Sequence, residues 1–403
     1  MNRTVYEGVF TPDDRVEQFY RYLPFDVPAT ARTIEVTLAY RGDGAVIDLG
    51  CMGAAEFRGW SGGARAEYTI TATTATPGYR AGDLEPGTWN VMLGLHRIPA
   101  GVPYRVEVTV SARTPPPVEP SPVLVTPAVP RRLPAASGRR WLAGDLHSHS
   151  EHSDGDWTLP QLAAGAAEAG LDFLAVTDHN TVSHHRHLSA VTGVHLLPGQ
   201  EVTTDRGHAN AFGDIGWVDF RQSGQQWMVE VARRGGVISV NHPIATDCAW
   251  QYPLTVPPLM AEIWHCTWRD RTWRGPLAWW LTAGADVAAV GGSDFHSPGR
   301  DRPIGTPVTW VGVPAGEPVS TELIIAGLKA RDTAVSAHRD GPALLPVAGE
   351  LIAVDADGAI LTDFTGRRRM VRGDLATFAA RPGGHWLEDA RGQVLALCRL
   401  SGG

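Results

Sequence analysis

GDLHSHSEHSDGD, residues 144–156, is the stretch on which the predicted fold depends. It ends an apolar run and places His147 and His149 two residues apart. Side chains at i and i+2 of a strand point to the same face, so both imidazoles can bind one metal ion at the strand's C-terminal end. His152 and Asp154 follow within a short loop. An isolated pair of this kind also fits a His-rich surface loop, so the other motifs decide between the two interpretations.

Five further motifs bring more metal-ligating residue types into the same setting. Most of them end or closely follow an apolar run typical of a β-strand, and helical patterns lie between several of the runs. Parallel strands deliver functional residues from their C-terminal ends in an α/β barrel, so this pattern favours that fold and one shared site. The motifs are TDHN at 177–180, GQE at 199–201, GHAN at 207–210, NHP at 241–243 and GGSDFH at 291–296, and the runs are WLAGDL, FLAVT, VHLLPG, VISV and VAAVG.

Helix signals separate the predicted strands. Thr158 and Gln161 have the spacing of a capping box, and Gly170 stands where the helix that they start should end. This helix would lie between the first two ligand-bearing strands, as a βαβ unit requires. Helical patterns also cover 225–235 and 321–330.

From residue 141 to about residue 342, the motifs resemble those of the polymerase and histidinol phosphatase superfamily of metallohydrolases in type and order. The resemblance implies an α/β fold, a distorted seven-stranded (β/α)7 barrel, with two or three divalent metal ions at its mouth. It also implies the ligands. One ion takes His147, His149, Glu201 and Asp294, a second takes Asp154, His179 and His296, and a third takes Glu201, His208 and His242, so that Glu201 bridges two ions.

Within that superfamily, the chain is most similar to the branch that includes carbaryl hydrolases, whose members often carry a β-rich domain ahead of the barrel. An asparagine commonly follows the tryptophan of one motif in that branch, where this chain has His265. The departure bears on the substrate class and leaves the metal ligands intact. The phrases that carry this similarity are AEIWH at 261–265, GGSDFHSPG at 291–299, IGTPVTWV at 304–311 and RDTAVSAHRDGPAL at 331–344.

The predicted ligands also indicate how the site would activate water. Adjacent divalent ions that share a carboxylate lower the pKa of a bridging water, which makes hydroxide available near neutral pH. Nitrogen and oxygen ligands fit Zn, Mn or Fe without distinguishing among them. The sequence shows no GxSxG elbow or Cys/His pairing that would indicate a protein nucleophile.

Asp178, His265 and Arg300 are the remaining catalytic candidates. Asp178 precedes His179 and could orient a neighbouring imidazole, although a turn aspartate is an equal interpretation. His265 ends the AEIWH motif, and Arg300 follows the GGSDFH motif. The run VSHHRH at 182–187 is expected to be a solvated loop or helix start, with proton donation as the alternative.

The segment WHCTWRDRTWRGPLAWW at 264–280 concentrates tryptophans and arginines. Placed after a barrel strand, it could form a rim that holds an aromatic or anionic substrate. The alternative is that Trp279 and Trp280 pack in the core while the arginines face water.

The chain outside the predicted barrel at 139–342 divides into three parts. Short alternating runs at 1–113 predict an antiparallel β-sandwich, which serves as a scaffold or dimerisation domain or, through Trp60 and Trp89, binds carbohydrate. Prolines at 114–138 predict an extended linker. Short strands and glycine turns at 343–403 predict a small β-rich extension.

Composition limits the classes of function. The formal net charge of −8 disfavours general nucleic-acid binding. No apolar run of membrane length and no signal-peptide core occur, so a cytoplasmic protein is expected. The cysteines lack CxxC spacing and are expected to be reduced thiols.

These observations predict a metal-dependent hydrolase acting on a small molecule, with phosphate esters as the first substrate class. Carboxylic esters, carbamates or amides are the alternative that the nearer branch and the tryptophan-rich segment favour. A non-catalytic module that keeps its metals is disfavoured because every expected ligand is present. Nuclease activity is disfavoured by the net charge, and the oligomeric state stays open.

Overall fold

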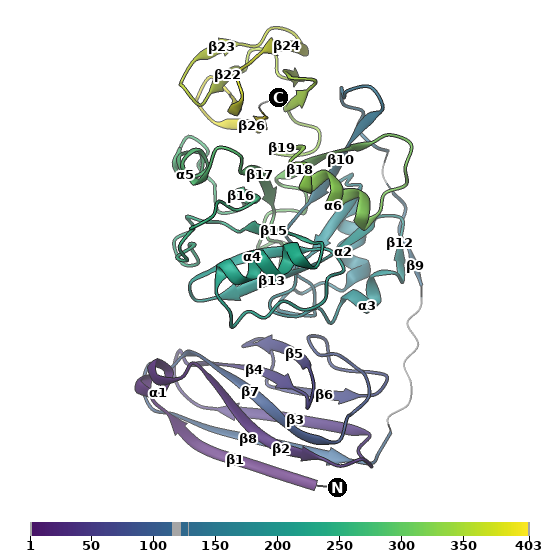
Figure 1. Ribbon diagram of the computed structural model, residues 1–403, viewed down its shortest axis with the longest axis vertical. Helices are drawn as coiled ribbons and strands as arrows, with labels where there is room; N and C mark the ends of the chain where they lie inside the picture. The colour runs from purple at the N-terminus through teal and green to yellow at the C-terminus, as the bar shows by residue number, and fades with distance from the viewer. Residues whose placement is uncertain (1, 115–121, 128, 402–403) are drawn as a thin grey trace. The chain divides into compact units, whose positions relative to one another are not determined.

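The computed structural model describes residues 2–114, 122–127 and 129–401, which fall into two compact units (Figure 1). The first unit contains the described residues before 122 together with two short segments, 151–154 and 178–186. The second unit contains the rest of the chain, so the predicted boundary at 342/343 does not separate the two units. The linker predicted at 114–138 lies partly outside the described residues.

Two four-stranded antiparallel sheets build the first unit. Buried and exposed side chains alternate along β3 and β8, as expected when one face of a sheet packs on a core. Apolar side chains of both sheets share one core, so the unit is a β-sandwich. One sheet has the order β1 (Asn2–Phe10), β8 (Val102–Ser111), β3 (Thr33–Tyr40) and β6 (Glu67–Thr71); the other has β2 (Tyr20–Val27), β7 (Gly87–Arg97), β4 (Val46–Met52) and β5 (Phe57–Gly62), with α1 (Pro12–Glu17) between β1 and β2.

Trp60 and Trp89 are buried in the sandwich, with 4% and 0% of their surface exposed. Trp89 packs in the core and donates from Nε1 to the carbonyl of Glu85 at 3.0 Å. The carbohydrate-binding alternative required exposed rings at these two positions, and both are buried. A ring without an exposed face cannot stack on a sugar, so the carbohydrate-binding alternative loses its basis.

One thirteen-stranded sheet forms the frame of the second unit. Register pairs show that β10, β11, β13, β15, β16 and β17 all run in the same direction, with β14 as an antiparallel insertion. Their C-terminal ends therefore meet at one edge. The sheet order is β17 (Ala288–Gly292), β16 (Met260–His265), β15 (Val237–Val240), β14 (Gly207–Phe212), β13 (His195–Thr204), β11 (Phe173–Val176), β10 (Arg139–Asp145), β18 (Val308–Pro314), β19 (Thr333–Ser336), β26 (Val394–Leu400), β25 (Gly383–Glu388), β22 (Ile360–Asp363) and β23 (Arg368–Met370).

The predicted α/β barrel needs correction, because the described chain is mostly β and its large sheet is not closed by a ladder. The edge of β10 that faces away from β11 pairs with β18 over residues 139–144. The backbone groups of that edge are therefore already hydrogen-bonded and are not available to close a barrel. Beyond that ladder, a single parallel bridge joins Ser148 to Phe295. The sheet therefore curls back on itself at the edge that carries the C-terminal strand ends, and closes there by one bridge.

Helices are fewer than an α/β barrel requires. Thr158 caps α2 through the predicted capping box with Gln161, and the helices predicted near 225–235 and 321–330 are confirmed. The connection from β15 to β16 contains no helix, because its four prolines at 243, 253, 257 and 258 interrupt helical hydrogen bonding. The helices of the second unit are α2 (Leu159–Glu168), α3 (His185–Leu188), α4 (Gly224–Arg233), α5 (Gly275–Ala283) and α6 (Thr321–Lys329).

The C-terminal strands extend the large sheet, because β26 pairs with β19. Three further strands form a small antiparallel sheet, and a two-residue parallel pair lies near the linker. These are β20 (Ala343–Val347), β21 (Glu350–Val354) and β24 (Leu375–Ala379), and then β9 (Val123–Leu124) with β12 (Val191–Thr192).

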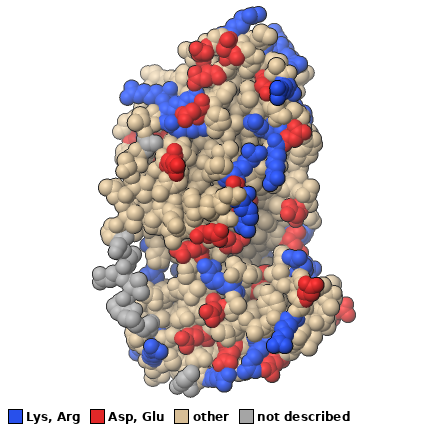
Figure 2. Space-filling model, turned by 180° about the vertical axis from the view of Figure 1, so that it is seen from behind, with Lys and Arg blue, Asp and Glu red and all other residues tan. Residues whose placement is uncertain are grey.

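Acidic and basic side chains are interspersed on the face shown in Figure 2. Among the described residues, no helix is both long enough and apolar enough to cross a bilayer. The cytoplasmic location and the absence of general nucleic-acid binding stay predictions.

Thr309 links β18 to β17, two strands that are not neighbours in the ladder. Its buried hydroxyl accepts from the N–H of Gly291 and donates to the carbonyl of the same residue, both at 2.8 Å. We predict that Thr309→Val lowers the free energy of unfolding by about 1–3 kcal/mol, because it leaves buried backbone groups without this partner. Thr309→Ser keeps the hydroxyl and should lose less. Urea unfolding of both variants checks this, and a Thr309→Val variant as stable as Thr309→Ser would contradict it.

Candidate metal centre

The curled edge of the large sheet brings four predicted ligands of two distant motifs together. The carbonyl of His147 accepts from the N–H of Asp294 at 3.0 Å, and the N–H of His149 donates to the carbonyl of Phe295 at 2.9 Å. The rings of His149 and His296 stack with centroids 4.1 Å apart. The backbone bridge therefore sets the spacing of side chains that are about 145 residues apart in sequence.

Asp145 holds the two motifs together through hydrogen bonds to their backbone. Its buried carboxylate accepts from the backbone N–H groups of His147 at 3.1 Å, Ser293 at 3.0 Å and Gly305 at 2.8 Å. Burial raises the pKa of Asp145, and these hydrogen bonds oppose the rise. Asp145 thus ties the end of β10 to the segment after β17.

His147 presents one ring nitrogen to two carboxylates. Its Nδ1 lies 3.0 Å from Oε1 of Glu262, and because a carboxylate only accepts, Nδ1 donates there. Its buried Nε2 makes no hydrogen bond, although Oδ1 of Asp294 and Oε1 of Glu201 lie 3.1 and 3.3 Å away. In the neutral ring, Nε2 is a lone pair that faces two other acceptors, an arrangement that a cation between them stabilises.

The distances fit such a cation. Neighbouring ligand atoms bound to one ion at about 2.0–2.2 Å lie about 2.8–3.1 Å from one another in octahedral geometry and about 3.3–3.6 Å in tetrahedral geometry. The Nε2 atoms of His147 and His149 lie 3.1 and 3.0 Å from Oδ1 of Asp294. These three residues form one of the groups that could hold a metal ion.

Glu201 lies close to His147 of this group and to two further histidines. Its Oε1 lies 3.3 Å from Nε2 of His147, 3.2 Å from Nδ1 of His208 and 3.4 Å from Nε2 of His242. Glu201, His208 and His242 form a second group that could hold an ion. Asn241 donates from Nδ2 to the same Oε1 at 2.8 Å and so orients the carboxylate.

Electrostatics also favour a cation. Burial alone would lower the pKa of His147, but the three surrounding carboxylates, led by Asp294, raise it well above its usual value. Burial would raise the pKa of Asp294, yet His147, His149 and His265 hold it well below its usual value. Clustered buried carboxylates of this kind are stable only beside positive charge, which a divalent ion supplies.

His265 has a different role from the other histidines, because its proton position is fixed. Its Nε2 lies 3.1 Å from Oδ2 of Asp294, and because a carboxylate only accepts, Nε2 carries a proton and donates there. His265 therefore donates to Asp294 and turns that carboxylate toward His147. Burial opposes it, but Glu262 and Asp294 raise the pKa of His265 to about 9.

The backbone is strained at these positions. His242 and Asp294 have positive φ values of 25° and 51°, which are uncommon for residues with side chains. Such conformations cost about 1–3 kcal/mol each and persist only when the surroundings hold them. Their location at two predicted ligands is typical of a functional site.

Asp154 and His179 lie in the two segments that belong to the first unit. Oδ1 of Asp154 is 3.7 Å from Nε2 of His179. In the second unit, His296 donates from Nδ1 to the carbonyl of Asp294 at 2.9 Å, which leaves its Nε2 as the coordinating atom. The prediction that these three residues share an ion stays a prediction.

The structure changes the interpretation of Asp178 and of the His-rich run at 182–187. Asp178 and His184 are fully buried, with Oδ2 and Nδ1 3.0 Å apart, so the prediction that the His-rich run is solvated is wrong for His184. Asp178 also accepts from the hydroxyl of Ser153 at 2.7 Å. Asp178 thus orients His184, which is not one of the predicted metal ligands. Arg300, another catalytic candidate, is exposed.

The predicted substrate rim is largely structural. Trp264, Trp268 and Trp280 are buried in one cluster. Arg271 lies over the ring of Trp264 and donates to the carbonyl of Val394 at 3.1 Å. Arg274 pairs with Glu388 at 3.0 Å. The C-terminal strands therefore engage both arginines, and Arg269 stays exposed.

Glu262 is a site residue that the sequence analysis missed. Its Oε1 accepts from His147, and its Oε2 accepts from the N–H of His242 at 3.0 Å. It lies in the apolar strand β16 and is 4% exposed. A carboxylate inside a buried strand needs partners, and that signal was present in the motif AEIWH.

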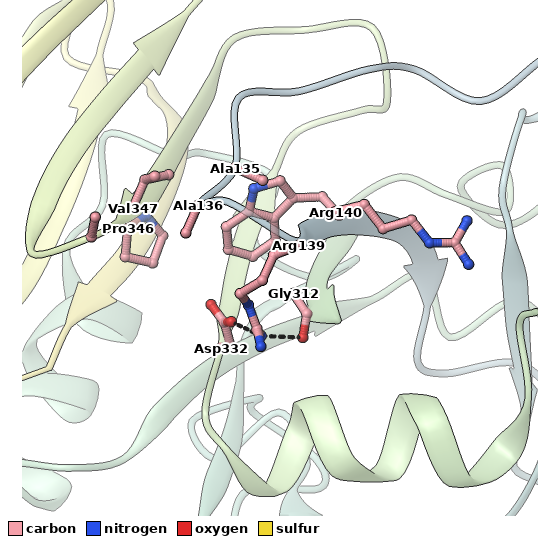
Figure 3. A pocket seen from close by; sticks show the side chains of 10 residues that line it. Ala135, Ala136, Arg139, Arg140, Gly312, Asp332, Pro346 and Val347 are labelled. Carbon is pink, nitrogen blue, oxygen red and sulfur yellow. Dashed lines mark hydrogen bonds and ion pairs between the residues drawn. The ribbon is translucent and has the colours of Figure 1, made fainter. Parts of the chain in front are cut away.

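A cavity of about 180 Å³ lies at the opposite end of β10 (Figure 3). Arg139 and Arg140 both line it, and Arg139 pairs with Asp332 and donates to the carbonyl of Gly312 at 2.9 Å. The strand separates it from the metal-ligating end by about 20 Å. This cavity is therefore distinct from the candidate centre.

Comparisons with known proteins give distant structural likenesses. A two-domain protein from Bacteroides vulgatus with a predicted PHP-like metal-dependent phosphoesterase matches 68% of this chain and 99% of its own, at 18% identity and TM-score 0.44. A predicted metal-dependent phosphoesterase from Bifidobacterium adolescentis and an amidohydrolase from Chromobacterium violaceum each match 47% of this chain and 96% of their own. Both are 16% identical, with TM-scores of 0.31 and 0.30. No family model and no curated protein matches the sequence. These values are too low to establish a shared fold or activity.

Glu262 is predicted to control metal affinity through His147 and His242. Glu262→Ala should weaken metal binding by about 10- to 100-fold, the usual effect of removing a carboxylate that orients a ligating imidazole. Glu262→Gln keeps one acceptor oxygen and should have a smaller effect. Glu350→Ala, at an exposed glutamate, is the control. Titration with Co²⁺ measures the affinities, and wild-type affinity in Glu262→Ala would contradict the assignment.

Proposed function

We propose that this chain is a metal-dependent hydrolase of small molecules that binds two or three divalent ions of Zn, Mn or Fe. The first ion is held by His147, His149, Glu201 and Asp294. The third is held by Glu201, His208 and His242, and the second by Asp154, His179 and His296. The groups of the first and third ions are supported by the atom spacing described above.

The observation that carries the proposal is the position of Glu201. One buried carboxylate lies within 3.4 Å of ring nitrogens from three different strand ends and loops, at His147, His208 and His242. A purely structural carboxylate needs hydrogen-bond donors, which Asn241 already supplies. Convergence of three further imidazoles is the arrangement of a bridging ligand between two ions.

The ligand-orienting residues support a working site. Glu262 holds the proton of His147 on Nδ1, which leaves Nε2 for coordination. Asn241 holds Glu201, and His265 holds Asp294 through its second oxygen. Each side chain is therefore fixed before substrate binds, which is what preorganised catalysis requires.

Bound divalent ions would supply a water of lowered pKa and Lewis acidity toward the oxygens of the substrate. The protein then has no need of a serine or cysteine nucleophile. Cys248 lies 3.3 Å from Nδ1 of His242, and its pKa is raised by burial and by Asp247, so it is a thiol that supports the ligand. His265 donates its proton to Asp294 and stabilises the negative charge there.

Phosphate esters are the proposed substrate class. Arg300 is exposed four residues after the end of the GGSDFH motif, on a turn that Asp301 holds by accepting from the N–H groups of His296 and Ser297 at 2.8 and 2.6 Å. A guanidinium at this place suits an anionic leaving group or phosphoryl oxygen. Carboxylic esters, carbamates and amides are the competing class, and an assay with both classes separates them.

The enzyme should hydrolyse a chromogenic phosphate ester after purification without chelator and addition of Mn²⁺ or Zn²⁺. His147→Ala and Asp294→Ala should each lower kcat/KM by more than about 1,000-fold, because each removes a ligand of the first ion. His338→Ala, at an exposed histidine, is the control. Metal content and circular dichroism should accompany the assay.

Three outcomes decide the proposal. Turnover of only a carboxylic ester would replace phosphate esters by the competing class. Substantial residual activity in both variants would contradict the ligand assignment. A chain that binds no metal and is not activated by added metal is not a metallohydrolase.

A further inference from the structure

The first unit contains two short segments, 151–154 and 178–186, that lie outside the sandwich strands in sequence. Segment 151–154 ends with Asp154, and segment 178–186 contains His179, so each carries a proposed ligand of the second ion. No strand or helix covers 146–158 or 177–184. Ordering a backbone costs conformational entropy, so loops of this kind need other partners to hold a ligand in place.

Arg65, just before β6, contacts the first segment directly. Its Nη1 donates to the carbonyl of Ser153 at 2.9 Å, and its Nη2 donates to the carbonyl of Glu151. One guanidinium therefore binds two carbonyls on either side of His152, immediately before Asp154. The planar fork of arginine suits this double contact, whereas the single ammonium of a lysine does not.

The peptide of Gly78 contacts the second segment in both directions. Its N–H donates to the hydroxyl of Ser183 at 3.0 Å, and its carbonyl accepts from the hydroxyl of Thr181 at 2.8 Å. Thr181 and Ser183 are 1% and 2% exposed, so loss of either bond leaves a buried polar group without that partner. Gly78 has a φ of +98°, and a Cβ there would lie 3.0 Å from the carbonyl oxygen of His152.

The two segments are also joined to each other. The hydroxyl of Ser183 accepts from Gly78 and is also hydrogen-bonded to Nδ1 of His152 at 2.7 Å. The hydroxyl of Ser153 donates to Asp178, whose other oxygen meets His184. A continuous chain of hydrogen bonds thus runs from sandwich residues through both segments to the positions next to Asp154 and His179.

We propose that the sandwich is a positioning element for two ligands of the second metal ion, Asp154 and His179. Arg65 and the Gly78 peptide fix segments 151–154 and 178–186, and so hold the carboxylate of Asp154 and the ring of His179 3.7 Å apart. This inference rests on the proposed function, because it assigns a role to residues that support one of its ion sites. Arg65, Thr181 and Ser183 are positioning residues, since none of them is a proposed ligand.

Arg65→Met and Thr181→Val test the inference through metal binding, independently of turnover. Each variant should bind the second Co²⁺ ion about 10- to 100-fold more weakly than wild type, the usual effect of losing a residue that orients a ligand. The other ions should bind unchanged. Thr181→Ser keeps the hydroxyl and should restore binding. Arg80→Met, at a sandwich arginine that contacts Glu56 and Phe57, is the matched control.

Titration with Co²⁺, followed by visible absorption and by metal content, separates the outcomes. Selective loss of one ion in both variants supports the inference. Wild-type affinities in both variants overturn it while leaving the hydrolase proposal intact. Equal loss of every ion, together with a lowered melting temperature, means a general structural role and also overturns it. A wild-type chain that binds no Co²⁺ refutes the hydrolase proposal, and this inference with it.

Discussion

Buried negative charge is the constraint on which the candidate centre depends. Glu201 and Glu262 are 1% and 4% exposed, and Asp294 lies beside them. A carboxylate in such surroundings is stable only if it lies beside a cation or takes up a proton. Here the neighbouring side chains are imidazoles whose other nitrogens are already engaged, as for His147 and His265. A divalent ion at this place would balance the charge.

The curled edge of the large sheet brings these carboxylates and imidazoles together. Parallel strands bring their C-terminal ends together, and the bridge between Ser148 and Phe295 closes the remaining distance. Asp145 ties the same junction by accepting from three backbone N–H groups. Strain at His242 and Asp294 is tolerated because both sit within this network. Within the first unit, sandwich residues contact the two segments that carry Asp154 and His179.

The sequence predicted the parts of this arrangement that local patterns encode. His-X-His spacing, the capping box of Thr158 and the positions of ligands after apolar runs are all short-range signals. The open order of the large sheet was not predictable in the same way, because it depends on the pairing of β10 with β18, two strands that are far apart in sequence. Glu262 was missed because one carboxylate in an apolar strand gives no spacing signal. The burial of Trp60, Trp89 and His184 arises from tertiary packing that residue type alone does not reveal.

Anomalous X-ray diffraction from crystals grown with Mn²⁺ or Zn²⁺ tests the central claim most directly. The account predicts one peak among His147, His149 and Asp294 and another between His208 and His242, with Glu201 binding both ions at about 2.0–2.2 Å. Absence of any anomalous peak beside Glu201 at saturating metal would contradict it. The carboxylates would then be held by protons and hydrogen bonds alone, and the chain would not be a metallohydrolase.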